Sequence, residues 1–218
     1  MTPEDFNNIP KLPGPFGEAL QVAYIVKDID QAIAHWREQH DVGPFLINRN
    51  ITPLQNTYFR GEKSDKTPIN IAFSYIDGMQ LEIIQPLHDI PSLYNEALER
   101  NTDGVHHYAA RVDDFPAAYN WALDNGYDAV VDVGIDGLAR MSYVENKEAG
   151  LIIEVIEWND LTRPIFDSLY LKWQSIESDG HDQEFELQKL TPAGAVFKEL
   201  GKFLVKKLTG QVKATRRI

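Results

Sequence analysis

Two glutamates interrupt apolar stretches of the sequence, and each has a polar partner at the head of an earlier apolar stretch. Glu82 and Glu154 both have apolar residues on either side, and their partners are Gln21 and His107. A carboxylate at the centre of a buried strand is costly unless it is paired or bound to a metal. An imidazole, an amide and two carboxylates that meet in one cleft could hold a cation or move a proton.

The four residues occupy equivalent places in an internal repeat. Gln21–Ala32 has the same layout as His107–Ala118, so the amide of the first copy stands where the imidazole of the second stands. Met79–Pro86 matches Leu151–Trp158 in the same way. At one constant offset, identical residues recur as Ala23 and Ala109, Val26 and Val112, Asp28 and Asp114, and Ala32 and Ala118. Such a repeat predicts two copies of one supersecondary unit, which would bring the two polar pairs together if the halves close one sheet.

Each copy predicts the order β-α-β-β-β. In the first copy, Asp28 or Asp30 caps the helix, Gly43-Pro44 ends it, and Asp77-Gly78 forms a hairpin turn. In the second copy, Asp114 caps the helix and Asn125-Gly126 closes it. The predicted strands are 20–26, 45–48, 69–76, 79–85, 105–112, 127–133, 138–144 and 151–157. Residues 58–59 are a further short strand and 91–100 a connecting helix. Strand alternation predicts that His106 points away from His107.

Two segments lie outside the repeat. Residues 1–17 are rich in proline and glycine and predict an irregular N-terminal arm. The repeat domain spans 18–160, with modules at 18–88 and 104–158. The remaining segment, 161–218, predicts a helix around 165–173, a polar linker at 178–184, a second helix from Thr191 and a basic tail. Both helices have one apolar face, so we expect the extension to pack as a lid or a dimer contact.

The composition excludes several classes of protein. The net charge of -12 argues against nucleic acid as the main partner. The chain has 0 cysteines, so disulfides and thiolate metal sites are absent. No segment approaches the ~18 consecutive apolar residues of an integral membrane segment. The polar, acidic N-terminus does not resemble a signal peptide. We therefore expect a cytoplasmic protein.

Residues 18–158 resemble the vicinal oxygen chelate superfamily, which includes glyoxalase I, methylmalonyl-CoA epimerase, extradiol dioxygenases and bleomycin resistance proteins. The resemblance is carried by the sequences at 104–114, 81–87 and 152–154, and the first two are most similar to methylmalonyl-CoA epimerase. It implies an α+β fold in which two βαβββ modules form a half-barrel around one divalent metal. The ligands that it implies are Gln21, Glu82, His107 and Glu154.

The implied activity is proton transfer next to a carbonyl through an enolate or enediolate, as in an isomerase, an epimerase or a lyase. Glu154 or Glu82 would move the proton, with Glu154 preferred. The ligand set suits Zn, Mn, Co, Ni or Mg and does not choose among them. The substrate would be a small molecule.

Two departures from the family pattern keep alternatives open. The epimerases have histidine where this chain has Gln21, although animal glyoxalase I has glutamine there. Asn70 lies on the strand where the epimerases carry a second catalytic carboxylate, which puts a two-base epimerisation in doubt. An extradiol dioxygenase is less favoured because its iron needs two histidines. The alternative is a metal-free protein that binds or sequesters a small molecule, as bleomycin resistance proteins do.

Five further side chains are candidates for lining an apolar substrate cleft. They are Tyr58, Phe73, Tyr75, Met141 and Tyr143. On two-residue spacing, Phe73 shares a strand face with Tyr75, and Met141 shares one with Tyr143. Packing between the barrel and a helix explains the same pattern equally well. We expect the protein to be a homodimer.

Overall fold

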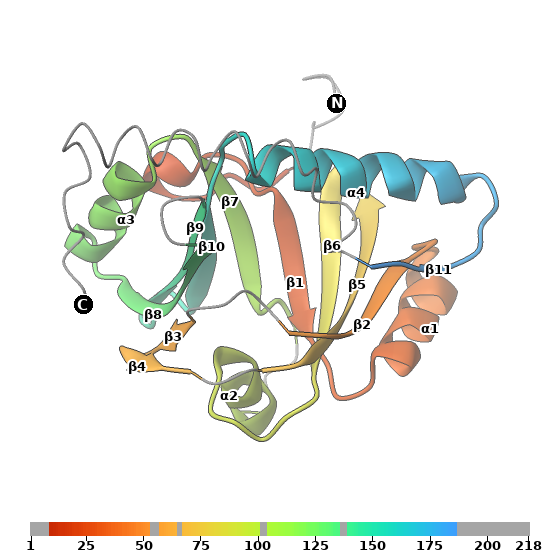
Figure 1. Cartoon of the computed structure of the whole chain (residues 1–218), viewed down its shortest axis with the longest axis horizontal. Coiled ribbons are helices and arrows are strands. Elements are labelled where there is room, and N and C mark those ends of the chain that lie inside the picture. Colours follow the sequence, from red (N-terminus) through yellow and green to blue (C-terminus); the bar gives the residue numbers. More distant parts are fainter. Residues whose placement is uncertain (1–8, 53–56, 65–66, 101–103, 136–138, 187–218) are drawn as a thin grey trace.

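The computed structural model describes residues 9–52, 57–64, 67–100, 104–135 and 139–186. Its strands form one curved sheet in the order β11-β2-β5-β6-β1-β7-β10-β9-β8-β3-β4. Strands β1 and β7 pair antiparallel at the centre, and each is flanked by its own module. Helices α1 and α3 lie at opposite sides of the molecule, with α4 across the top and α2 below (Figure 1). The mixed α/β architecture of two modules that share a curved sheet confirms the predicted fold.

Module 1 contains β1 (Gln21–Ile25), α1 (Ile29–His40), β2 (Leu46–Ile51), β5 (Ile69–Ile76) and β6 (Met79–Pro86). The Asp28 carboxylate accepts a hydrogen bond from the Gln31 amide at 3.0 Å and so starts α1. Asp77 and Gly78 have φ values of 48° and 83°, which are the left-handed angles of a two-residue hairpin turn. Helix α1 packs Ile29 and Ile33 against the outer, convex face of these strands.

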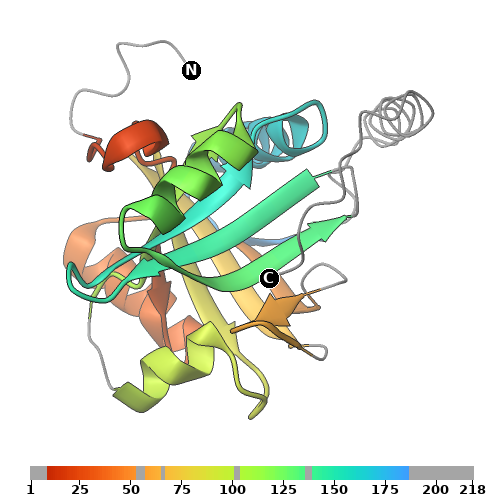
Figure 2. The ribbon, with the colours of Figure 1, turned by 90° about the vertical axis from the view of Figure 1, so that its left-hand side faces the viewer.

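Module 2 repeats the order with β7 (His107–Val112), α3 (Phe115–Asp124), β8 (Asp128–Ile135), β9 (Ala139–Asn146) and β10 (Leu151–Glu157). Asp114 caps α3 by accepting from the Ala117 amide at 3.0 Å. The N-terminal arm packs on the same convex face as α3, because its short 3-10 turn η2 (Gly14–Phe16) inserts Phe16 into that core. Figure 2 shows η2 and α3 side by side.

Each outer edge of the sheet is extended by a strand from elsewhere in the chain. The hairpin of β3 (Tyr58–Phe59) and β4 (Glu62–Lys63) comes from module 1 but pairs with β8 of module 2. At the other edge, β11 (Gln183–Glu184) pairs with β2. The prediction of a plain linker at 178–184 was therefore wrong at its end, because the Asp182 carboxylate binds the Phe45 amide at 2.9 Å and guides the chain onto the edge of β2.

Helix α4 (Thr162–Glu177) covers the inner, concave face of module 1. Leu169, Trp173 and Ile176 of α4 form one core with Phe73 and the other inward-facing residues of the sheet. The Trp173 indole also donates a hydrogen bond to the Pro44 carbonyl at 3.0 Å. The first part of the extension thus packs on its own chain, whereas the helix predicted from Thr191 lies outside the described residues. In the parts of the chain that the structure describes, no helix is long and apolar enough to cross a membrane.

Candidate metal centre

The register of the sheet places the four candidate ligands on its concave face. Ala23 of β1 is the cross-strand neighbour of both Glu82 and His107. Ala109 of β7 is in turn the neighbour of both Gln21 and Glu154. Residues directly opposite each other in a sheet point to the same face, and so do residues two apart on one strand. The two modules are therefore related by an approximate twofold axis between β1 and β7, and a small alanine lies between the longer side chains of each pair.

His107 is the centre of this cluster. Its Nε2 atom lies 3.6 Å from Oε2 of Glu82 and 3.7 Å from Oε2 of Glu154. The residue is 1% exposed, and the two glutamates are 7% and 5% exposed. Burial lowers the pKa of His107, but the neighbouring Glu154 and Glu82 outweigh that effect and raise the pKa to about 9. For Glu82 the effect of burial has the opposite sign: burial raises its pKa, whereas His107 and Gln21 act to lower it.

The donor types in the cluster fit a divalent cation. Nε2 of His107 is one of the buried polar atoms without a hydrogen-bond partner among the described residues. Ligands of a tetrahedral zinc ion lie about 3.3–3.6 Å from one another, close to the separations around His107. Glu82, His107, Glu154 and the amide oxygen of Gln21 are the groups that would hold such an ion.

The side chains do not yet converge on one point. Within the described ranges, no group of three or more His, Cys, Asp or Glu side chains is placed so that it could hold a metal ion. The two carboxylates instead flank the imidazole in ion-pair contacts, because His107 provides the positive charge that two buried carboxylates require. Binding of a cation would replace that charge and would require the carboxylates to rotate toward it.

His106 fixes the orientation of the His107 ring. Nδ1 of His106 lies 2.8 Å from Nδ1 of His107, so one nitrogen donates to the other. Burial lowers the pKa of His106 to about 3, assisted by the charge of His107, so His106 stays neutral at pH 7. Binding of a cation would require His107 to lose its extra proton; if Nδ1 of the neutral imidazole then donates to His106, Nε2 carries the lone pair that a cation needs.

The predicted orientation of His106 was wrong. Strand β7 begins only at His107, so strict alternation does not apply to the residue before it. The His106 backbone amide still donates to the Ala23 carbonyl at 2.8 Å. Its side chain therefore lies beside that of His107 rather than on the opposite face.

Two tyrosines complete the surroundings of the cluster. Tyr143 is the cross-strand neighbour of Glu154, and its ring centre lies 5.0 Å from that of His107. The Tyr143 hydroxyl lies 3.2 Å from the hydroxyl of Tyr94. Tyr94 comes from α2 (Leu93–Arg100), the helix that connects the modules. The sequence offered no signal for Tyr94, because the connecting helix has no counterpart in the repeat.

The five candidate cleft residues lie in different surroundings. Tyr75 packs against Tyr170 and Trp173 of α4 with ring-centre distances of 5.0 Å in both cases, and Phe73 belongs to the same core. The packing alternative therefore describes Phe73 and Tyr75. Of the other three, Tyr58 is 37% exposed on the β3–β4 hairpin, Met141 is partly exposed on β9, and Tyr143 is buried beside His107.

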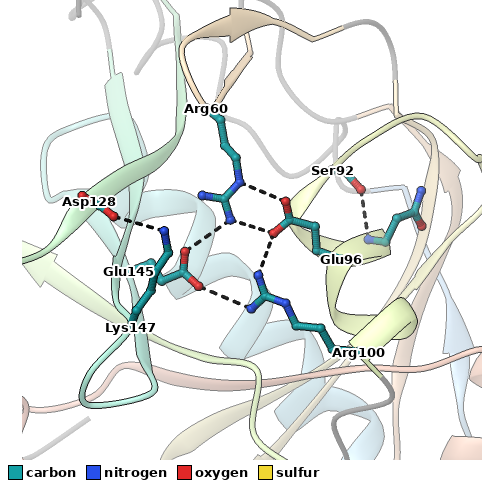
Figure 3. A network of polar contacts seen from close by, with 8 residues as sticks. Arg60, Ser92, Glu96, Arg100, Asp128, Glu145 and Lys147 are labelled. Atoms are coloured by element: carbon teal, nitrogen blue, oxygen red, sulfur yellow. Dashed lines mark hydrogen bonds and ion pairs between the residues drawn. The ribbon is translucent and has the colours of Figure 1, made fainter.

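Helix α2 is held against module 2 by a ring of four alternating charges. Figure 3 shows Glu96 and Arg100 of α2 facing Arg60 of the β3–β4 turn and Glu145 of β9. The Arg60 guanidinium contacts Glu96 at 2.7 Å and Glu145 at 3.3 Å. Arg100 contacts the same two carboxylates at 3.2 and 3.5 Å. Leu93 packs beside Tyr143 at the start of the helix, next to Tyr94, and the ring holds the helix at Glu96 and Arg100.

Comparison of the sequence with models of known protein families identifies one match. Residues 20–143 match the family model of the glyoxalase/bleomycin resistance protein/dioxygenase superfamily. The chain belongs to this superfamily. The matched segment contains Gln21, Glu82 and His107, whereas Glu154 lies beyond it and is placed by the repeat and by the register of β10.

Several solved structures are similar to the chain at low sequence identity. A hypothetical protein from Bacillus halodurans C-125 is 18% identical, with a TM-score of 0.47, over 65% of this chain and 94% of that chain. Methylmalonyl-CoA epimerase from Mycobacterium tuberculosis is 20% identical, with a TM-score of 0.45, over 68% and 93% of the two chains. A Streptomyces coelicolor methylmalonyl-CoA epimerase is 17% identical, with a TM-score of 0.40, over 64% and 95%. No curated protein sequence matches the chain.

Proposed function

We propose that this protein is a divalent-metal-dependent isomerase, epimerase or lyase that moves a proton at the carbon next to a carbonyl. The observation that carries the proposal is the placement of two buried glutamates on either side of Nε2 of His107, on one face of the sheet. Membership of the superfamily supports it. When bound by Gln21, Glu82, His107 and Glu154, the ion would supply Lewis-acid polarisation of the carbonyl.

The chain itself supplies the base. Glu154 would take the proton from the carbon and return it, because a carboxylate placed beside the substrate can act as both general base and general acid. The Glu82 side of the cluster continues into the core beneath α4 through Phe73, its cross-strand neighbour. Glu154 is instead adjacent to β9, where Met141 remains partly exposed. A substrate would therefore approach from the module 2 side, where Glu154 lies.

The test joins metal analysis to an exchange screen. Purified protein is stripped with a chelator, reloaded separately with Zn, Mn, Co, Ni or Mg, and analysed for bound metal. Each form is then incubated in deuterium oxide with 2-oxo acids, CoA thioesters and glutathione hemithioacetals, and exchange at the carbon is followed by NMR. We expect one ion per chain and metal-dependent exchange in one substrate class.

A matched pair of variants controls this experiment. Glu154→Gln should abolish exchange, whereas Glu148→Gln, at an exposed position in the β9–β10 turn, should not change it. The proposal is contradicted if none of the five ions binds, or if the stripped protein exchanges as fast as the reloaded one.

A metal-free binding protein is the second candidate. It is favoured by the finding that, in the described residues, no three His, Cys, Asp or Glu side chains already form a group that could hold a metal ion. In that case the Glu82–His107–Glu154 ion pairs would be the resting state of a binding cleft. The same screen separates the two, because a binder would retain ligands without metal and would catalyse no exchange.

The proposal includes a homodimer. Among the described residues, Leu171 is the most exposed large apolar side chain. It is 64% exposed on the outer face of α4 and is a candidate contact for a second copy. Light scattering of wild-type protein and of Leu171→Glu would measure the mass in solution. A dimer that contacts α4 would dissociate in the variant.

A further inference from the structure

We propose that the hydroxyl groups of Tyr94 and Tyr143 form a donor pair that binds the substrate oxygen at the candidate centre, with Tyr143 in contact and Tyr94 as its positioning residue. This inference rests on the proposed function and assigns the group that would stabilise negative charge developing on that oxygen. It concerns residues outside the repeat-derived ligand set.

The position of Tyr143 is fixed by the sheet. It is the cross-strand neighbour of Glu154 in the antiparallel β9–β10 pair, so both side chains project from the concave face. Its ring meets the His107 ring edge to face, with 5.0 Å between centres and an angle of 79°. Tyr143 therefore lies beside two of the candidate ligands, Glu154 and His107.

Tyr94 reaches the same place from α2. Its ring lies 6.4 Å from the ring of Tyr143 and 6.0 Å from that of His106. It also packs against the core that α4 forms with module 1. Tyr94 thus bridges the two modules at the point where their polar residues meet.

The chemistry of the pair leaves one proton available. Two hydroxyl groups carry two protons, and their mutual contact at 3.2 Å uses one of them. The second proton is free for another acceptor. A tyrosine hydroxyl is an ordinary donor at neutral pH. A substrate oxygen bound on this face could accept it.

A donor placed where charge develops is the arrangement that accelerates enolate chemistry. Removal of one such donor typically costs about 10²–10³-fold in kcat. Tyr94 would contribute indirectly, because its hydroxyl sets which way the Tyr143 hydroxyl points. The two residues should then act as one unit rather than additively.

The experiment uses Tyr143→Phe, Tyr94→Phe and the double variant in the full-length, metal-loaded protein. Tyr127→Phe is the matched control, because Tyr127 is a buried tyrosine in the convex core with Phe16 and Trp121. Urea unfolding establishes that each variant is folded, and calorimetry with the metal alone establishes that the ion still binds. The readouts are then kcat and KM for exchange, together with the affinity for oxalate, a planar oxyanion that mimics an enolate.

We expect Tyr143→Phe to lower kcat about 10²-fold, with a smaller change in KM, and to weaken oxalate binding while metal affinity stays constant. Tyr94→Phe should show a smaller loss, and the double variant should be no worse than Tyr143→Phe. Exchange and oxalate binding equal to those of Tyr127→Phe would overturn the inference while the proposed function stands. Absence of both metal and exchange in the wild type would overturn the proposed function and this inference with it.

Discussion

The two modules share one plan on the convex face and differ on the concave face. In both, an aspartate caps a helix that packs outside the sheet, and a glutamate on the last strand lies beside an alanine on the first. On the concave side, module 1 is covered by α4, and its first strand begins with Gln21. Among the described residues, α2 covers module 2 at one end, and the first strand of this module begins with His107.

This difference separates what the repeat controls from what the added segments control. Sheet register alone brings the four polar residues together, because the approximate twofold axis needs only matched strands. The segments outside the repeat decide which side remains available to a substrate. Helix α4 covers the concave side of module 1, so in the proposed function a substrate would approach Glu154 from the side of module 2.

The largest effect should come from replacing each of the two glutamates in turn. Glu154→Gln is expected to lower kcat by about 10²–10⁴-fold with metal still bound, because it removes the base. Glu82→Gln is expected to act mainly through weaker metal binding, which added metal would partly restore. The measurement is kcat for exchange as a function of metal concentration. Equal losses of kcat in both variants at saturating metal would mean that the two modules contribute alike.

Loss of the contact between α4 and module 1 should lower the free energy of unfolding. Trp173 is buried and hydrogen-bonded to Pro44, so Trp173→Ala should lower the free energy of unfolding by about 3–5 kcal/mol, as large aromatic truncations do. Gln174→Ala at an exposed position of the same helix is the control, with about 0.5 kcal/mol or less. Urea unfolding gives both numbers. A small loss for Trp173→Ala would show that α4 is a detachable lid rather than part of the module 1 core.

Much of this organisation could be predicted from the sequence, and the reason is the repeat. The hairpin at Asp77-Gly78 and the caps at Asp28 and Asp114 are local signals, and the structure has each of them. The matched glutamates predicted one shared face because strand alternation is a fixed geometric rule.

The parts that could not be predicted depend on contacts between distant segments. The side chain of His106 lies beside His107 because β7 starts two residues later than the strand that the sequence suggested. The place of Tyr94 depends on how α2 crosses between the modules. The pairing of β11 with β2 follows from Asp182 binding the Phe45 amide, which is 137 residues away in sequence. No local pattern marks such contacts.

A third prediction makes the two modules more alike. Gln21→His would place an imidazole where His107 stands in the other module. A neutral imidazole is a better ligand for zinc than an amide, so metal affinity should rise by about tenfold. Substitutions of residues that only hydrogen-bond to metal ligands already change metal affinity by about this factor. Calorimetric titration with zinc measures it. Unchanged or weaker affinity would show that position 21 does not contribute a ligand.

The smallest effect concerns the ring that holds α2 on module 2. The neighbouring Arg60 holds the pKa of Glu96 below its usual value, with Arg100 adding to the effect and burial opposing it. Its stabilising contribution is therefore present above the unfolded-state pKa of about 4.3 and is lost as the pH falls through the lower folded-state pKa. Because the side chains are partly exposed, Glu96→Gln should cost about 1 kcal/mol or less at pH 7 and nothing at low pH.

The pH dependence of urea unfolding tests the ring against a solvent-exposed control. Glu99→Gln lies on the same helix at an exposed position and should leave the acid limb unchanged. If Glu96→Gln follows the wild-type curve at every pH, the ring does not stabilise the docking of α2.

The most direct test of the central claim is the zinc affinity of wild-type protein against His107→Ala, with His181→Ala as an exposed histidine control. The account predicts one ion per chain in the wild type and in His181→Ala, and a loss of at least about 10²-fold in affinity in folded His107→Ala, because the buried imidazole is the ligand that both modules surround. The account is contradicted if the wild type binds no ion, or if His107→Ala binds zinc as tightly as the wild type.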